Sequence, residues 1–205
     1  MSGNLKILDQ SFYNRKNVVQ VARDLLGKIL ITQLDGVRSS GRIVETEAYA
    51  GVEDRASHAF GGRRTARSEH LYGDPGTVYV YICYGMHHLF NVITNKKDIP
   101  HGVLIRALEP MEGIEHMLNR TGKPVADYTL TKGPGNLSCA LGMTKFHSGG
   151  NVFSEEISIA DDGLRYKKNE IVITKRIGVE GAREDADLPY RFIVKGNPYV
   201  SAKKS

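Results

Sequence analysis

Two glutamates and a tyrosine alternate along a stretch of chain that otherwise has the character of a β-strand. The stretch GRIVETEAYA, residues 41–50, places Glu45, Glu47 and Tyr49 at every second position, and a strand directs such residues to one face. Carboxylates two residues apart lie roughly 6–7 Å from each other, so burial of both requires a raised pKa or a cationic partner. The stretch is either an exposed strand face or a half-buried cleft. Ile43 on the same face favours the cleft.

A polar, glycine-rich segment follows at residues 51–76, and its lack of a sustained apolar period predicts a long loop. It contains His58 and the basic run GGRRTAR, with Arg63, Arg64 and Arg67. A single histidine is commonly a structural hydrogen-bonding residue, and a basic run is commonly a solvated surface. Glycines let backbone amides approach a ligand closely, so the same cluster also suits contacts to phosphate groups.

Three tyrosines gather in the stretch GTVYVYICYG. Tyr79 and Tyr81 share one strand face, and Tyr84 falls at a turn beside Gly85. Strand propensity alone accounts for such an enrichment. An aromatic residue at a hairpin tip also has the shape to wedge between two base steps of a nucleic acid.

Other motifs limit the possible chemistry. The chain has no GxxxxGK[ST] phosphate loop and no GxGxxG between a strand and a helix. His87 and His88 are adjacent, so a strand would point them in opposite directions, and His101, His116 and His147 lack ligand spacing with one another. The sequence therefore predicts no metal and no cofactor. Cys83 and Cys139 form no CxxC pair, and we expect both to fill the core in a reducing compartment.

Charge and hydropathy indicate the surroundings. The chain has 28 Lys+Arg and 23 Asp+Glu, a formal charge of +5 and a pI near 9.1, which moderately favours a polyanionic partner. The first residues lack the apolar segment of a signal peptide, and no later run is long enough to span a membrane. We expect a cytoplasmic protein without a membrane partner.

The elements that must position these residues follow from periodicity and turn residues. A helical stripe ended by Gly27 predicts a helix at 17–26, and Asp35-Gly36 predicts a hairpin between two alternating runs. Two strands at 77–94 meet near Tyr84. Further patterns predict strands at 102–110, 170–179 and 190–201, and helices at 111–120 and from Pro134 onward.

The predicted fold class is α+β. At 205 residues and 40% apolar content the chain can bury one core, and strands adjacent in sequence favour antiparallel pairing. We expect residues 1–205 to form a single compact domain with short flexible termini, in which a mainly antiparallel, curved sheet is flanked by helices. Pro110 is expected to close its strand, because proline cannot donate to a ladder.

Taken together and in order, the motifs resemble one family. The chain is similar to the alkyladenine DNA glycosylases, also called the methylpurine or 3-methyladenine DNA glycosylase family, from about Leu26 to its final strand. The resemblance rests on RIVETEAY, ASHAFGGRRTAR, GTVYVYICYGMHHLFNV, LIRALEP and GPGNLSCALG.

The resemblance implies catalytic roles for three positions. Glu47 would be the general base that activates water, Arg106 would help it hold that water, and the backbone carbonyl of Ile177 would make the third water contact. Glu45 would support Glu47 from outside the pocket.

The resemblance also implies how substrate is held. Tyr49, His58 and Tyr81 would stack on an extruded base, and Asn91 would screen purines. Tyr84 would intercalate into the DNA. The phosphate contacts would come from three arginines of the glycine-rich segment: Arg63, Arg64 and Arg67.

The implied activity is that of a base-excision-repair DNA glycosylase. It would flip alkylated or deaminated purines (3-methyladenine, 7-methylguanine, hypoxanthine, ethenoadenine) out of duplex DNA and hydrolyse the N-glycosidic bond. It would leave an abasic site without cutting the strand, as a bacterial, cytoplasmic, nucleoid-associated monomer without cofactor or metal. Two alternatives stay open: a metal-dependent nuclease using Glu45, Glu47 and His58, and a non-catalytic protein that binds damaged DNA.

Overall fold

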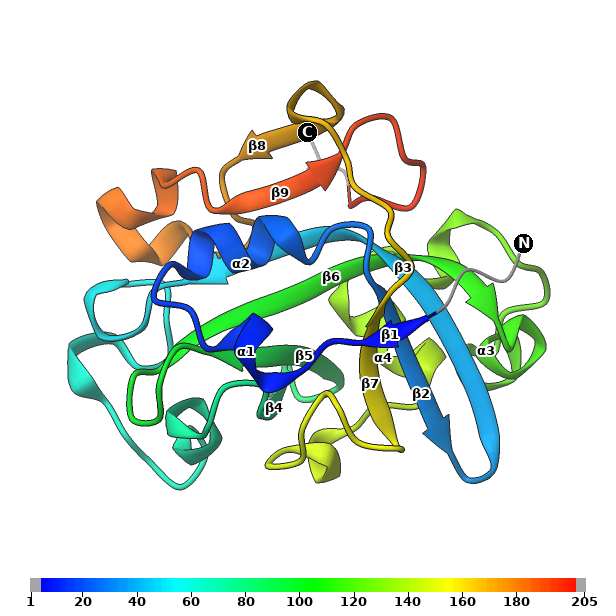
Figure 1. Ribbon diagram of the computed structural model, residues 1–205, viewed down its shortest axis with the longest axis horizontal. Helices are drawn as coiled ribbons and strands as arrows, with labels where there is room; N and C mark the ends of the chain where they lie inside the picture. Colours follow the sequence, from blue (N-terminus) through cyan, green and yellow to red (C-terminus); the bar gives the residue numbers. More distant parts are fainter. Residues whose placement is uncertain (1–4, 202–205) are drawn as a thin grey trace.

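The computed structural model describes residues 5–201, whose strands form one sheet with short helices packed against it (Figure 1). The strands are β1 (Lys6–Ile7), β2 (Ile29–Leu34), β3 (Val37–Tyr49), β4 (Val78–Cys83), β5 (His87–Thr94), β6 (His101–Glu112), β7 (Ile157–Asp161), β8 (Ile171–Thr174) and β9 (Arg191–Val194). The α-helices are α1 (Gln10–Tyr13), α2 (Val18–Asp24), α3 (Ile114–Thr121) and α4 (Pro134–Leu141).

Within this range the sheet has nine strands. Seven follow the order β1-β7-β2-β3-β6-β5-β4, while β9 lies beside β3, and β8 lies beside β9. Each named strand pair in residues 5–201 is antiparallel. The predicted α+β class with a mainly antiparallel sheet is confirmed. The predicted flexible termini reach into residues 1–4 and 202–205, which lie outside the described residues.

Strand β3 is the long strand that carries the two glutamates. Its first half pairs with β2, its second half pairs with β9, and β6 runs along its opposite edge. The turn between β2 and β3 is Asp35-Gly36, with φ of 52° and 76°, as the predicted hairpin requires. Glu45 and Glu47 consequently lie inside the sheet, between β6 and β9.

The ladder between β3 and β6 is irregular at these glutamates. Successive residue pairs skip Val44 on β3 and Arg106 on β6, with register shifts on either side of Glu45. Such bulges re-aim side chains next to functional sites. Here the irregularity accompanies an arginine side chain that lies between two carboxylates.

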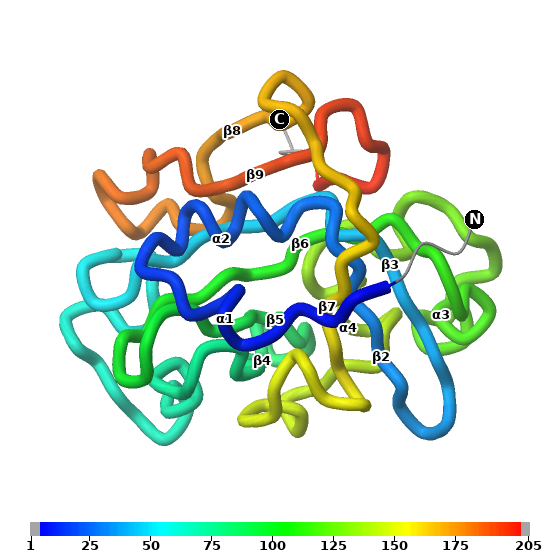
Figure 2. Tube along the Cα trace, in the orientation of Figure 1, coloured from blue at the N-terminus to red at the C-terminus, as the bar shows by residue number. Residues whose placement is uncertain are grey.

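Helices cover both faces of the sheet. Figures 1 and 2 show α2 in front of β3 and β6, and the hydroxyl of Thr46 donates to the carbonyl oxygen of Ala22 in α2 at 2.8 Å. The predicted helical stripe is buried against the sheet. Helix α4 packs against β5 and β6, and its first residues lie where the pocket described below opens. No helix within residues 5–201 is long and apolar enough to cross a membrane.

Three predictions of local structure are wrong. β6 continues past Pro110 to Glu112. β5 pairs only with residues 101–104 of β6, so the edge of β6 beside Pro110 has no β5 partner, and the N–H that proline lacks is not needed for pairing with β5. The segment 51–76 contains three short 3₁₀ helices rather than a plain loop. Neither cysteine fills the core. Cys83 is half-buried, and Cys139 is exposed because leucine and alanine form the buried face of α4.

Candidate active site

A cavity of about 510 Å³ opens on the face of the sheet that bears Glu47. It is walled by strands β4, β5 and β6, by the loop after β3, by the segment after β8, and by the start of α4. The residues that the sequence predicted and that this cavity brings together are Tyr49, His58, Tyr81, Tyr84, Asn91, Arg106 and Ile177. Segments from most of the chain therefore meet at one place.

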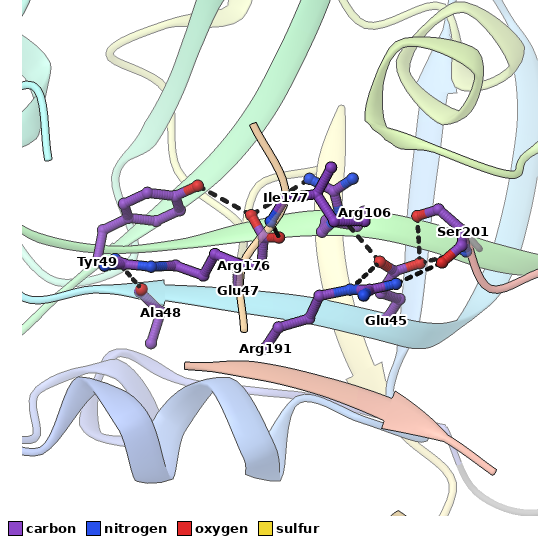
Figure 3. Close-up of polar contacts among 9 residues, drawn as sticks. All are labelled: Glu45, Glu47, Ala48, Tyr49, Arg106, Arg176, Ile177, Arg191 and Ser201. Carbon is purple, nitrogen blue, oxygen red and sulfur yellow. Dashed lines mark hydrogen bonds and ion pairs between the residues drawn. The ribbon is translucent and has the colours of Figure 1, made fainter. Parts of the chain in front are cut away.

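Glu47 is fully buried behind the lining of this cavity: its own side chain is not among the lining residues, and it reaches the cavity through its hydrogen-bond partners. Its Oε2 accepts hydrogen bonds from the Tyr49 hydroxyl at 2.9 Å and from Nη1 of Arg106 at 3.2 Å, while Oε1 accepts from the backbone N–H of Ile177 at 2.8 Å. Figure 3 shows these groups converging on the carboxylate. All three donors line the cavity.

The charge on Glu47 is set by opposing effects. Burial raises the pKa of Glu47 above its ordinary value, whereas Arg106, the amide of Ile177 and the hydroxyl of Tyr49 lower it in part. Burial likewise raises the pKa of Tyr49 well above the usual range, so this hydroxyl keeps its proton and can only donate to the carboxylate. The predicted raised pKa and the predicted cationic partner are both present.

Glu45 is held more completely and does not line the cavity. Its Oε1 accepts from Nε of Arg106 at 2.9 Å and Nε of Arg191 at 2.7 Å, and its Oε2 accepts from the N–H and hydroxyl of Ser201, both at 2.6 Å. Both glutamates are 0% exposed. The alternative of an exposed strand face is therefore wrong.

Aromatic rings form one wall of the cavity. The rings of His58 and Tyr81 meet edge to face with centroids 4.5 Å apart, and Nδ1 of His58 lies 2.9 Å from the buried hydroxyl of Tyr79. Burial lowers the pKa of His58, and Arg67 and Arg63 lower it further. The imidazole is therefore neutral near neutral pH and offers a flat, uncharged edge.

The tip of the β4–β5 hairpin projects beside the cavity. Tyr84 is 89% exposed, in the left-handed conformation with φ of 51°, and nearby Met86 is 70% exposed. A tyrosine this exposed gains nothing from the protein core. Asn91, on β5, donates from Nδ2 to the carbonyl oxygens of Tyr79 and Leu89 at 3.2 and 3.1 Å, which fixes its side chain at the cavity wall.

The three arginines of the glycine-rich segment lie outside the cavity lining. Arg64 is already paired with Glu69 and Asp98, at 2.5 and 2.8 Å. Arg67 donates to the carbonyl oxygen of Ile82 at 3.0 Å, close to the hairpin tip. Their contact with phosphate, like that of Arg63, stays a prediction.

Several residues that shape the site carry no local sequence signal. Arg191 and Ser201 hold Glu45 from more than a hundred residues away along the chain. Arg176 forms a buried pair with Asp54 behind the cavity wall. Lys132 lines the cavity at the start of α4. Only the proximity of Arg176 to Ile177 in sequence offered a hint.

Known proteins resemble this chain along almost its whole length. The model of the methylpurine-DNA glycosylase (MPG) family matches residues 11–198. A protein of Clostridium perfringens (strain 13 / Type A) is 49% identical over 204 residues, covering 96% of this chain and 99% of the relative. One of Alkaliphilus oremlandii is 44% identical over 203 residues, with coverage of 96% and 99%.

A protein of Bacillus cereus (strain G9842) is 45% identical over 201 residues, which is 94% of this chain and 98% of the relative. All three relatives have the name "Putative 3-methyladenine DNA glycosylase". The matched residues include the cavity, both glutamates and the hairpin tip. The chain therefore belongs to the methylpurine-DNA glycosylase family.

Proposed function

We propose that this DNA glycosylase flips alkylated or deaminated purines out of duplex DNA and releases them with an activated water. Candidate lesions are 3-methyladenine, 7-methylguanine, hypoxanthine and ethenoadenine. The observation that carries the proposal is the buried carboxylate of Glu47, held by three donors at the wall of an aromatic cavity beside an exposed tyrosine.

Tyr84 would fill the gap that the extruded nucleotide leaves. A base inside a duplex is inaccessible, and extruding it costs a few kcal/mol of stacking. An aromatic wedge inserted from the minor groove offsets part of this loss. The hairpin tip supports this role because Tyr84 is almost fully exposed.

The cavity would receive the extruded base between flat side chains. Tyr49, His58 and Tyr81 line it, and their rings would replace the stacking that the base loses. A purine made cationic by alkylation is additionally attracted to the electron-rich faces of tyrosine rings. The side chain of Asn91 is fixed by two backbone carbonyls, so it would screen bases by shape.

Glu47 would act as the general base. A carboxylate offers about four acceptor positions, and three donors are found on Glu47, so one position is left for a water. Removing a proton from that water makes it a nucleophile, and the negative charge stabilises the oxocarbenium-like sugar as the bond to the base breaks. The carbonyl of Ile177 would be a further contact of the water.

The two rival functions fit the geometry less well. A metal ion bound by Glu45, Glu47 and His58 would compete with arginines that already bind both carboxylates and with the Tyr79 hydroxyl at His58. A non-catalytic DNA-binding protein would have no use for an ionisable carboxylate that is desolvated yet held by three donors. We further propose that the enzyme acts as a monomer, since one chain supplies the whole cavity.

Replacement of the general base tests the proposal directly. Glu47→Gln should lower single-turnover base release by at least about 100-fold, because general-base catalysis typically contributes that much, while the affinity for a lesion duplex is kept. Glu112→Gln is a matched control, since Glu112 is exposed and pairs with Arg38 on the surface. Base release by Glu47→Gln at the wild-type rate would refute the assigned base.

The pH dependence follows from the raised pKa of Glu47. The base works only when ionised, so activity should fall as the pH drops through a pKa above the usual range for glutamate. Hypoxanthine is neutral in the nucleotide and needs protonation to leave, so its profile should be bell-shaped. The 7-methylguanine nucleotide is already cationic and releases a neutral base, so its profile should lack the basic limb. Single-turnover rates on both duplexes across pH test this expectation. Identical profiles would contradict acid assistance.

The wedge is tested by Tyr84→Ala. The substitution should weaken binding of a lesion in duplex DNA by about tenfold or more, because the unfilled gap costs stacking energy, and should affect the same lesion in single-stranded DNA much less. Leu164→Ala removes another exposed apolar side chain and serves as the control. Equal losses on duplex and single strand would rule out a wedge.

The product distinguishes a monofunctional glycosylase from its rivals. Lys132 lines the cavity, but its lysine amine is proposed to take no part in the chemistry. Borohydride should therefore trap no covalent complex, and strands should break only after alkali. Base release should persist in EDTA. Strand breaks before alkali that disappear with EDTA would indicate the nuclease instead.

A further inference from the structure

A buried ion pair lies directly behind the wall of the cavity. The side chains of Arg176 and Asp54 are 0% and 1% exposed, and the two guanidinium nitrogens Nη1 and Nη2 donate to the two carboxylate oxygens at 2.5 and 2.9 Å. Asp54 also accepts from the backbone amides of Ala50 and Ala56, at 2.9 and 3.0 Å. The pair is therefore geometrically well defined.

Arg176 joins several segments that are distant in sequence. It donates to the carbonyl oxygen of Ala48 on β3 at 2.9 Å and to that of Asp185 at 3.0 Å. Its guanidinium carbon lies 4.8 Å from the ring centroid of Tyr49 and 5.3 Å from that of Tyr190. Figure 3 shows the side chain of Arg176 running alongside Tyr49 toward Ala48, and Figure 2 shows the segments after β3 and β8 at one end of the molecule.

Two of the three residues that donate hydrogen bonds to Glu47 lie directly beside Arg176. The N–H of Ile177, the next residue in the chain, donates to Oε1, and the hydroxyl of Tyr49 donates to Oε2. Neither Arg176 nor Asp54 lines the cavity. Any effect of the pair on a bound base would therefore pass through its neighbours Tyr49 and Ile177, which do line the cavity.

Buried ion pairs are weak evidence for stability, because desolvation offsets much of their attraction and apolar replacements of similar volume are often as stable. The gain from such a pair is definite geometry. Here its hydrogen bonds end on the backbone of two segments that are distant in sequence, at Ala48, Ala50 and Ala56 in one and at Asp185 in the other.

We propose that Arg176 and Asp54 are positioning residues for base release, which hold the Ile177 amide and the Tyr49 ring in contact with the general base. The inference rests on the proposed function of Glu47. Loosening the pair would separate the carboxylate from two of its donors while leaving the DNA-binding surface in place.

The pair is tested by Arg176→Lys, which keeps the charge but loses the bidentate geometry. At saturating enzyme, the rate of base release from a hypoxanthine duplex should fall by about tenfold or more, since charge-assisted hydrogen bonds contribute that much. The dissociation constant for the duplex should change by less than about threefold, because contacts with DNA are kept.

The acid limb of the pH profile of base release gives a second readout. It would not shift if Arg176 served only the stability of the fold. The charged and titratable groups that act on Glu47 are Arg106, Glu45, Tyr49, Tyr81 and Arg176. Arg176→Lys weakens the donors that favour ionised Glu47, so burial should raise its pKa further. The acid limb should then move to higher pH.

Arg42→Lys is the matched control. Arg42 makes a bidentate pair with Asp162, at 2.8 and 3.2 Å, and donates to the carbonyl oxygen of Gly27 at 2.7 Å, but none of these residues lines the cavity. The Arg42→Lys variant should keep the wild-type rate of base release and the wild-type acid limb, even where the substitution lowers its melting temperature.

If Arg176→Lys does not fold, Asp54→Asn keeps the shape of the carboxylate and should show the same loss of rate and the same shift. The inference, but not the proposed function, would be overturned if a folded Arg176→Lys or Asp54→Asn variant kept the wild-type rate of base release and the wild-type acid limb. It would also be overturned if the loss of rate were no larger than that of Arg42→Lys. If neither variant folds, the pair serves stability, and the inference is overturned as well. Absence of base release by the wild-type chain would instead refute the proposed function.

Discussion

The guanidinium of Arg106 lies between two fully buried carboxylates, and the rest of the site depends on this contact. Two carboxylates on one strand face cannot both ionise in a buried place without cations. Arg106 and Arg191 together match the charges of Glu45 and Glu47. The sheet can therefore enclose both carboxylates beside their cationic partners, although burial still raises the pKa of Glu47.

The two glutamates illustrate how environment divides one residue type into two roles. Glu45 accepts four hydrogen bonds, two from arginines and two from Ser201, so it has no spare acceptor for a reactant. Glu47 accepts three, all from residues that line the cavity. The saturated carboxylate anchors Arg106, and the less saturated one keeps an acceptor position for the water that the proposed function requires.

Much of this arrangement was predictable from local patterns. The alternation of Glu45, Glu47 and Tyr49 indicated a shared face, and Asp35-Gly36 indicated the hairpin, because both signals lie within a few residues. Arg191, Ser201 and the Arg176–Asp54 pair were missed, because contacts between distant segments leave no periodicity. The prediction at Pro110 failed for a related reason. Whether proline ends a strand depends on whether its neighbouring edge is paired, which only the sheet order decides.

The support of Glu45 by residues 191 and 201 also has a consequence for biosynthesis. Ribosomes make a chain from its amino end, so β3 emerges long before the segment that encloses it. Until that segment arrives, the glutamates lack one of their two arginines and remain open to water. A nascent chain of this protein would thus expose the hairpin tip first, and the buried arrangement of the two glutamates would form only after residues 191–201 have been made.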